Sequence, residues 1–229
     1  MWSATWPKEV QRLASTFLGE NPIQTQIGDT ELCASANVKQ IIRVIDDADK
    51  TRQLNKLVNK ILDDDNPKTI IFAMTKKKVD ELVTQMRRDG IPAMGMHGDK
   101  EQRERDFVLA EFKRGTSPFL VATDVASRGL DVKDIKFVIN YDYPNSAEDY
   151  VHRIGRTGRA GAKGTAYTFF TTKDAHGARD LIGVLRQAKM EIPSDLEAMQ
   201  NAVGSEKWHK GGGGKRGRGG GGGGGGGGT

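Results

Sequence analysis

From residue 38 onward, the apolar residues of the chain follow two alternating patterns. Short and nearly continuous apolar runs are typical of strands that are buried on both faces of a parallel sheet. Residues 69–74 form such a run, and further strand candidates lie at residues 38–45, 91–96, 119–122, 136–140 and 165–170. Between them, apolar residues recur at helical spacing, as on one face of an amphipathic helix. These helical segments are residues 54–62, 76–86, 101–113, 146–154 and 175–189. The alternation predicts parallel strand–helix–strand units with right-handed crossovers, and hence an α/β fold with an open parallel sheet and helices on both faces.

The residues ahead of this pattern predict two further elements and a linker. Pro7 suits the first turn of a helix, apolar residues follow it with helical spacing, and Gly19 suits the end of that helix. Residues 23–27 alternate in polarity, as a strand does. A lone helix and a lone strand bury too little surface to fold by themselves. Residues 30–37 have the composition of a linker, and the main folded domain is predicted to span residues 38–205.

The segment after residue 205 differs in kind from the domain before it. It holds about half of the 29 glycines of the chain, and its five lysines and arginines face one glutamate, so it carries +4 of the net charge of +5. A glycine-rich segment cannot offset its ordering entropy by burying apolar surface. Residues 206–229 are therefore predicted to be a disordered tail. This tail is either a flexible linker or an arm that adds nonspecific RNA affinity through charge and guanidinium stacking.

Composition narrows the class of protein further. The 229 residues are 36% hydrophobic and 28% charged, as expected for one globular domain with appendages. The single cysteine, Cys33, excludes an internal disulfide and fits a reducing compartment. No apolar run approaches the ~18 residues that a membrane-spanning helix needs, and the N-terminus has no signal-peptide pattern. These features predict an intracellular protein without membrane association.

Arginines and glycines are concentrated within residues 150–161. Arginine presents a planar fork of donors that matches a phosphate, and glycine lets the backbone approach a partner closely. Arg156 and Arg159 are spaced i and i+3, so they could project from one helical turn toward one anion. A solvated basic turn is the alternative interpretation of this stretch.

Polar residues and glycines follow several of the predicted strands. Thr75, Gly98, Thr123 and Asp131 each come after a strand end, and the carboxyl ends of parallel strands form the ligand-binding edge of an open α/β sheet. Thr75 and Gly98 also precede helices, whose N-termini present free N–H groups to phosphate. The placement of these residues therefore predicts a ligand site at this edge of the sheet.

Gln102 and Arg105 lie one helical turn apart, so both side chains could reach the backbone of one nucleic-acid strand. Backbone contacts of this type carry no sequence information. The same spacing is common on ordinary solvated helices, and that remains the alternative interpretation of the pair.

Four short motifs together resemble those of one protein family. The stretch His-Arg-Ile-Gly-Arg-Thr-Gly-Arg at residues 152–159 is similar to the sixth motif of the DEAD-box RNA helicases. Ser-Ala-Thr at residues 3–5, Gln-Arg-Glu-Arg at 102–105 and Thr-Asp-Val-Ala-Ser-Arg-Gly-Leu-Asp at 123–131 resemble other motifs of that family, in its order and spacing. The resemblance covers about residues 1–205. It implies a RecA-like fold and the C-terminal half of an ATP-dependent RNA helicase that separates short RNA duplexes, of the subfamily with an Arg-Gly-rich tail.

The resemblance implies roles in ATP hydrolysis for five residues. Arg156 and Arg159 would be arginine fingers that reach across a cleft to the γ-phosphate of ATP. His152 would bridge to the acidic motif of the other helicase domain. Asp131, with Gly129 beside it, would accept hydrogen bonds from the ribose hydroxyls of the nucleotide.

The resemblance also implies an RNA surface and a set of coupling residues. The residues expected to bind RNA are Thr75, Gly98, Gln102, Arg105, Thr123 and, in the tail, Arg218. The residues expected to couple the state of the nucleotide to the state of the RNA are Ser3, Thr5 and Arg128. Residues 1–29 would be a remnant of helicase domain 1, so Met1 is expected to be an internal residue of a longer chain.

The sequence contains only half of an ATPase site. A P-loop needs the pattern G-x-x-x-x-G-K-[ST], and neither this pattern nor the Asp-Glu-Ala-Asp motif occurs. ATP with Mg²⁺ is the implied cofactor, with the metal held by domain 1, and this chain alone is predicted not to hydrolyse ATP. No metal site is predicted here, because the histidines lack partners at ligand spacing.

Two other functions remain alternatives: a non-enzymatic module for RNA binding or annealing, in which the tail dominates, and a DNA helicase of the same superfamily. The partners expected are RNA, ATP and domain 1 of the same full-length chain, in a monomeric protein. The glycine-rich tail and the likeness to RNA helicases suggest a nuclear or nucleolar location, with shuttling to the cytoplasm.

Overall fold

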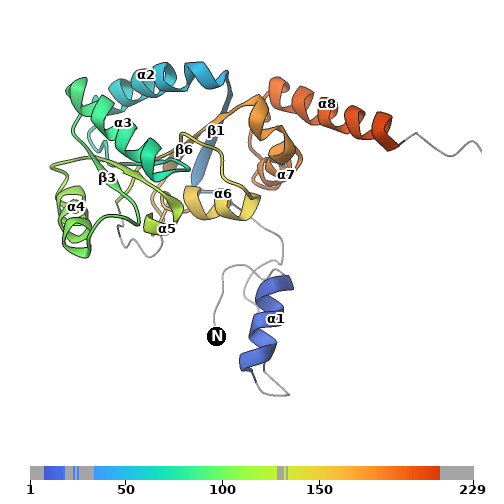
Figure 1. The fold of residues 1–229 in the computed structure, drawn as a ribbon, viewed down its shortest axis with the longest axis horizontal. Coiled ribbons are helices and arrows are strands. Elements are labelled where there is room, and N and C mark those ends of the chain that lie inside the picture. Colours follow the sequence, from blue (N-terminus) through green and yellow to red (C-terminus); the bar gives the residue numbers. More distant parts are fainter. Residues whose placement is uncertain are drawn as a thin grey trace, which may run out of the picture.

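The computed structural model of the chain describes residues 8–18, 23, 25, 34–127, 132 and 134–211. Its centre is a six-stranded parallel sheet (Figure 1). In chain order the strands are β1 (Val38–Val44), β2 (Thr69–Phe72), β3 (Ala93–Met96), β4 (Phe119–Ala122), β5 (Phe137–Asn140) and β6 (Gly164–Phe170). Their spatial order is β1-β6-β5-β2-β4-β3, which makes β1 and β3 the edges of the sheet. The open parallel α/β fold predicted from the apolar pattern is confirmed.

Two strands are two residues shorter than the apolar runs that predict them. The run at residues 69–74 forms strand only as far as Phe72, and the run at 91–96 forms strand only from Ala93. The flanking Ala73 and Ile91 are nevertheless buried. Apolar runs report burial rather than ladder hydrogen bonds, so they extend past the ends of the strands.

Helices cover both faces of the sheet (Figure 1). Helices α2 (Lys50–Leu62) and α3 (Lys76–Arg88) share one apolar cluster with the sheet side chains of one face. Helices α4 (Gln102–Arg114), α6 (Ala147–Ile154) and α7 (Ala178–Gln187) share the other cluster. Successive side chains of a strand point to opposite faces, and consecutive residues of β2 accordingly alternate between the two clusters. The central strands are thus buried on both sides, as their continuous apolar sequences predict.

Helix boundaries follow capping residues. The Thr75 hydroxyl accepts a hydrogen bond from the Lys78 N–H at the start of α3, and Ser146 caps α6 in the same way. Glu101 and Glu104 form a reciprocal capping box at the start of α4. That helix ends at Gly115, which has a φ of 81° and supplies the left-handed conformation of a helix C-terminus.

The helix predicted at residues 175–189 is present in two parts. The 3₁₀ helix η2 (Thr172–Gly177) comes first, and the α-helical conformation begins only with α7. Thr171 and Asp174 form a capping box one turn before the predicted start, which explains the earlier beginning. Two more short elements complete the domain: η1 (Asp47–Asp49) and α5 (Asp124–Ser127).

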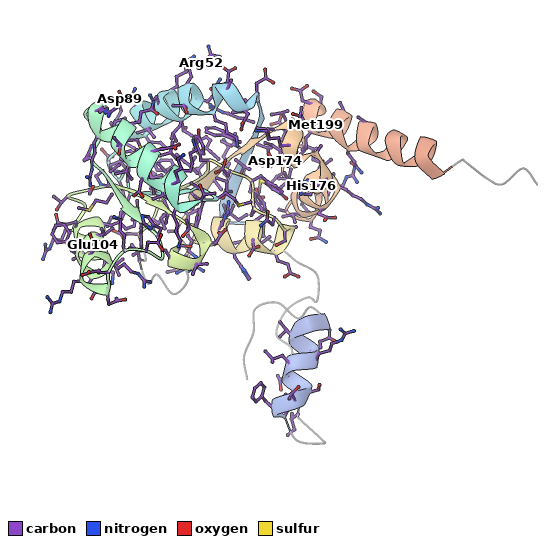
Figure 2. The ribbon with its side chains drawn as sticks, viewed as in Figure 1. Arg52, Asp89, Glu104, Asp174, His176 and Met199 are labelled. Carbon is purple, nitrogen blue, oxygen red and sulfur yellow. The ribbon has the colours of Figure 1, made fainter. Side chains whose placement is uncertain are left out.

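Helix α8 (Ser194–Gly211) has no counterpart in the sequence-based prediction. Its Leu196 is buried in the core and Met199 packs against that core, on the side of the domain that contains Asp174 and His176 of η2 (Figure 2). The backbone of residues 206–211 continues this helix, and the predicted disordered tail stays a prediction. Apolar residues are too sparse here for the periodicity test, and the helix is stabilised by packing of its first turns.

The predicted N-terminal helix is present as α1 (Lys8–Phe17) and lies apart from the sheet (Figure 1). Its Phe17 is 77% exposed. In the alternating stretch 23–27, the structure describes Ile23 and Thr25, and neither lies in a strand. The isolation of α1 agrees with the argument that this segment cannot build a core of its own.

Two buried tyrosines link α6 to the strand ends. The ring of Tyr143 packs edge-on against Phe170, with 4.9 Å between centroids, and lies 6.0 Å from the ring of Tyr150. Tyr150 donates a hydrogen bond of 2.8 Å to the side-chain oxygen of Gln40. The Tyr143 hydroxyl is buried without a partner among the described residues. Burial raises the pKa of both phenols above the ordinary value, because their charged forms would be poorly solvated.

Because the Tyr150 hydroxyl is hydrogen-bonded and the Tyr143 hydroxyl is not, removal of each hydroxyl should affect stability differently. Tyr143→Phe removes an unpaired hydroxyl and should leave the free energy of unfolding near neutral pH unchanged or higher. Tyr150→Phe removes a bonded hydroxyl and should lower it by about 1 to 2 kcal/mol.

The same two tyrosines predict how the free energy of unfolding changes at alkaline pH. A raised folded-state pKa contributes stability that is present below the unfolded value of about 10 and is lost as the pH rises through the folded value. Tyr143→Phe should therefore gain on the wild type above about pH 10. Urea unfolding at several pH values measures both effects, and a stability difference between Tyr143→Phe and the wild type that is the same at neutral and at high pH would contradict the assignment.

Candidate functional site

The carboxyl ends of the parallel strands bring three of the predicted site residues together. Thr75, Gly98 and Thr123 follow β2, β3 and β4, and β4 lies between the other two. Neighbouring strands are about 4.8 Å apart, so these three positions form one short row. Two hydrogen-bonded contacts tie the row together: the Thr123 N–H donates to the Met96 carbonyl, and Lys76 forms an ion pair with Asp99.

Gln102 and Arg105 continue this row along α4. Arg105 Nη1 donates to Gln102 Oε1 at 3.3 Å, so the two side chains do share one face, as their spacing predicts. Gln102 Nε2 in turn donates to Asp106. Arg105 Nε is buried and has no hydrogen-bond partner among the described residues. A buried N–H without an acceptor is costly, and this one suits an acceptor supplied by a ligand.

A buried arginine organises the other part of the edge. Arg153 of α6 is 2% exposed, and its Nε and Nη2 donate to the two carboxylate oxygens of Asp124, each at 2.6 Å. Its Nη1 donates to the Asp142 carbonyl at 2.6 Å, and its guanidinium lies over the ring of Phe72. Such a bidentate pair is strong and has a specific geometry. Arg153 therefore joins the segments that follow β2, β4 and β5.

His152 and Arg156 flank this arginine in the sequence and lie at the same place in space. Both line a small pocket with Phe72, Asp124, Ser127, Asp149 and Arg153. His152 is exposed in the last turn of α6. The pocket opens at the carboxyl edge of the sheet, where the sequence predicts a ligand.

Arg156 and Arg159 do not share a helical turn, which corrects the expectation from their spacing. Helix α6 ends at Ile154, with Gly155 as its C-cap, and Gly158 then takes a φ of 70°. Arg159 Nε donates to the Gly155 carbonyl at 2.8 Å and closes the turn. The glycines favour leaving the helix here, so the two arginines meet through a turn.

The two guanidinium groups are nevertheless close together. Burial lowers the pKa of Arg156, and the nearby charge of Arg159 lowers it further, because both disfavour a second cation at that position. Among the described residues, neither arginine forms an ion pair with a carboxylate. This pair of cations fits a polyanionic group such as a triphosphate.

The turn that carries Arg156 and Arg159 packs against the starts of β5 and β6. Thr157 is 1% exposed, and its hydroxyl contacts the carbonyls of Ile135 and Lys136 at 2.7 and 3.0 Å. A Cβ added to Gly164 would lie 2.0 Å from this hydroxyl oxygen. The glycine at the start of β6 therefore leaves the space that the Thr157 anchor needs.

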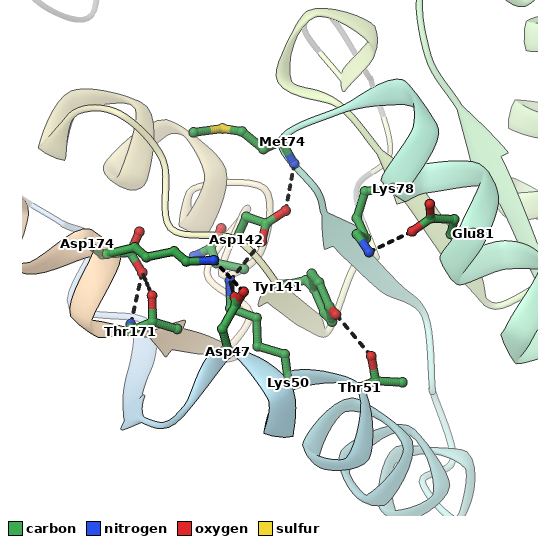
Figure 3. Close-up of polar contacts among 12 residues, drawn as sticks. Asp47, Lys50, Thr51, Met74, Lys78, Glu81, Tyr141, Asp142, Thr171 and Asp174 are labelled. Carbon is green, nitrogen blue, oxygen red and sulfur yellow. Dashed lines mark hydrogen bonds and ion pairs between the residues drawn. The ribbon is translucent and has the colours of Figure 1, made fainter.

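A second ionic network supports the same edge (Figure 3). One oxygen of Asp142 accepts from Lys50 Nζ at 2.9 Å, and the other accepts from the Met74 N–H at 3.0 Å. Lys50 also contacts Asp47, which pairs with Lys173. Burial disfavours the charge of Lys50, but Asp142 and Asp47 more than offset this effect and raise its pKa. The Asp142 side chain thus connects the start of α2 to the site, and the Asp142 carbonyl accepts a hydrogen bond from Arg153.

Several predicted residues lie outside the described part of the chain. They are Ser3, Thr5, Arg128, Gly129, Asp131 and Arg218. Sequence reasoning, in turn, missed the roles of Asp124, Asp142 and Lys50 and treated Arg153 only as one more basic residue. Asp124 and Arg153 stand inside the recognised motifs, so a search for opposite charges within them would have found the pair. No local signal marks Lys50, because its partner is distant in the sequence.

Two further properties belong to the described part of the chain. None of its helices is both long and apolar enough to cross a membrane. Within the same residues there is no group of three or more histidine, cysteine or acidic side chains that could hold a metal ion.

Known proteins match this chain both in sequence and in structure. The family model described as the helicase conserved C-terminal domain matches residues 49–161. The ATP-dependent RNA helicase dbp2 of Aspergillus clavatus is 56% identical over 199 residues, which are 87% of this chain and 36% of that protein. DBP2 of Saccharomyces cerevisiae is 55% identical over 196 residues, or 86% of this chain and 36% of that protein. The chain therefore spans about a third of the length of these curated relatives.

Solved structures give the same result. Dbp5 of S. cerevisiae, bound to RNA and ADP BeF3, superposes with a TM-score of 0.71 at 28% identity over 89% of this chain and 53% of that chain. The DEAD-box protein SrmB of E. coli, bound to regulator of ribonuclease activity A, superposes with a TM-score of 0.57 at 32% identity over 72% of this chain and 94% of that chain.

Fold and site together define a RecA-like helicase C-terminal domain. The chain belongs to the DEAD-box family of ATP-dependent RNA helicases, and it contains the C-terminal half.

Removal of the carboxylate beneath Arg153 tests the buried anchor. Asp124→Ala leaves a buried guanidinium without its ion-pair partner and should lower the free energy of unfolding by about 3 to 5 kcal/mol. Val125→Ala, at the exposed next position of α5, should change it by less than about 0.5 kcal/mol. Equal effects of the two substitutions in urea unfolding would contradict the role given to Arg153.

A pair of glycine substitutions tests the Thr157 anchor. Gly164→Ala places a methyl group against the Thr157 hydroxyl and should lower the free energy of unfolding by about 2 to 3 kcal/mol. Gly183→Ala, inside α7, meets no atom within 4 Å and should raise it by about 0.5 to 1 kcal/mol through helix propensity. The comparison uses the same unfolding assay, and a neutral Gly164→Ala would show that the anchor tolerates displacement.

Proposed function

We propose that this chain is the half of an ATP-dependent RNA helicase that completes the ATPase site of the other domain, with Arg156 and Arg159 as its arginine fingers. The observation that carries the proposal is the pair of neighbouring guanidinium groups beside the Arg153 anchor, in a member of the DEAD-box family. The longer protein would couple ATP binding and hydrolysis to local separation of an RNA duplex.

The chemistry assigned to this half is charge stabilisation. Phosphoryl transfer depends mostly on positioning and on neutralising charge at the transferred group. Domain 1 of the longer chain would supply the P-loop, the acidic motif and the Mg²⁺ that it holds. Closure of the two domains would bring Arg156 and Arg159 to the γ-phosphate of the ATP substrate, with His152 at the domain boundary.

The RNA substrate would lie along the row of residues at the carboxyl edge. Arg105 would donate its unpartnered Nε to a backbone phosphate, with Gln102 beside it on α4. Thr75, Gly98 and Thr123 would line the same path at the ends of β2, β3 and β4. Contacts to phosphates hold a strand without reading its sequence.

The fingers and the half-site are tested by ATP turnover. This chain alone should show no RNA-stimulated turnover, and a mixture with a separately produced DEAD-box domain 1 should show it. Arg156→Ala should reduce the turnover of the mixture by about 10³-fold or more, because an arginine finger stabilises the transition state by that order. RNA affinity of the variant should stay within about 2-fold of the wild type, since its loss concerns the nucleotide.

The matched control is Arg186→Ala on α7, an arginine whose side chain is 67% exposed and remote in sequence from the motifs. It should leave turnover unchanged. Turnover by this chain alone would refute the half-site. An active Arg156→Ala mixture would refute the finger, and an inactive wild-type mixture would favour a non-enzymatic RNA-binding module.

Location and assembly belong to the same proposal. The longer protein is expected in the nucleus or nucleolus, as a monomer whose two helicase domains come from one chain. A tagged full-length protein imaged in cells, and its mass in solution by light scattering, would test these two points.

A further inference from the structure

A groove of about 550 Å³ follows the edge strand β3. Met94 and Gly95 of β3 form its floor, and side chains of α3 and α4 form its walls. Figure 2 shows Glu104, one of its α4 residues, at the end of the domain opposite Asp174 and His176. The function proposed above makes no use of this groove.

The charges of the groove are unevenly compensated. Its carboxylates have partners: Asp80 lies 3.1 Å from His97 Nε2, and Glu104 accepts from the Glu101 N–H at 3.1 Å. Of its cations, Arg87 donates from Nε to the Ala93 carbonyl, whereas the side chains of Lys100 and Arg103 form no hydrogen bond or ion pair with any described residue. Arg87, Lys100 and Arg103 outnumber the carboxylates Asp80 and Glu104, so the groove has a small positive excess that is complementary to an anionic ligand.

An exposed aromatic ring stands on the α4 wall of the groove. Phe107 is 58% exposed although it is a large apolar side chain. It lies four residues beyond Arg103, so the ring and the guanidinium are neighbours on one face of α4. An exposed aromatic ring beside cations is the combination with which proteins hold single-stranded nucleic acid, because the ring stacks on a base and the cations hold phosphates.

The groove is continuous with the RNA row described above. Gln102 and Arg105 lie on α4 between Lys100 and Phe107 in the sequence, and they turn toward the adjoining face of the helix. A strand leaving Gln102 and Arg105 has only to cross the first turn of α4 to reach the groove.

We propose that single-stranded RNA continues from Gln102 and Arg105 into this groove, where one base stacks on Phe107 and Lys100 and Arg103 hold its phosphates. The inference rests on the RNA-binding part of the proposed function. Stacking and phosphate contacts accept any base, so this contact adds affinity and length to the RNA site without adding sequence specificity.

Titration of a fluorescein-labelled oligouridylate with the full chain, followed by anisotropy at several salt concentrations, tests the contact. Phe107→Ala should weaken binding by about 5- to 20-fold through lost stacking, with the salt dependence unchanged. Phe107→Trp should keep wild-type affinity. Lys100→Gln and Arg103→Gln should each reduce the slope of log K against log salt by about 0.7, the value for one phosphate on a single strand.

Matched controls come from α2, which does not line the groove. Leu62→Ala, at an exposed apolar side chain, and Lys60→Gln, at an exposed lysine, should change neither affinity nor slope. An oligouridylate with one abasic position at the groove should bind the wild type and Phe107→Ala equally, because the base that stacks is then absent. Circular dichroism of each variant checks that the fold is kept.

The outcomes separate the groove from the proposed function. No RNA binding by the wild type at low salt, or no loss in the double variant Gln102→Ala/Arg105→Ala, refutes the RNA row and the groove together. Loss in the double variant, with unchanged affinity and slope in the Phe107, Lys100 and Arg103 variants, overturns the groove contact alone. In that case an acidic peptide becomes the ligand that fits the free cations.

Discussion

The buried guanidinium of Arg153 is the interaction on which the arrangement of the site depends. An unpaired charge in the interior costs several kcal/mol, so the folded state must supply partners for it. Those partners are the Asp124 carboxylate and the Asp142 carbonyl, which come from segments after different strands. A planar guanidinium accepts them in only one orientation. The position of α6 relative to the sheet is set by this requirement, and His152 and Arg156 are placed as a consequence.

Arg156 and Arg159, by contrast, have no ion-pair partner among the described residues. Arg153 has its charge fully paired, whereas Arg156 has a lowered pKa because burial and Arg159 both oppose its charge. The surrounding turn keeps this unfavourable pair in place through the Thr157 anchor and the bond from Arg159 to Gly155. Any anion that binds the folded chain there relieves the repulsion and so stabilises the fold.

The fold could be predicted closely from the sequence, and the site only in part. The central strands β2, β4 and β5 were visible because burial on both faces leaves a continuous apolar run, and the Thr75 cap was visible because hydroxyl caps act locally. Helix α8 was not, since its stability comes from a few core contacts such as Leu196 and not from periodicity. The spacing of Arg156 and Arg159 suggested a helical turn, but glycines at 155 and 158 end the helix before them. The Lys50–Asp142 pair joins residues 92 positions apart, and no local pattern can reveal such a contact.

The two halves of the edge differ in how their charges are compensated, and this difference has a functional meaning. Toward β5, the buried charges of Arg153 and Lys50 are paired within the chain, so α6, α2 and the strand ends form one rigid support. Toward β3, polar groups such as Arg105 Nε lack acceptors among the described residues, and the loops there are tied mainly by one exposed ion pair. A rigid support suits residues that must meet a phosphate with accurate geometry, since misplacement by about 1 Å is costly in catalysis. A row of unsatisfied donors suits a ligand that completes it. Arg156 therefore lies beside the rigid support toward β5, and Arg105 lies among the unpaired polar groups toward β3.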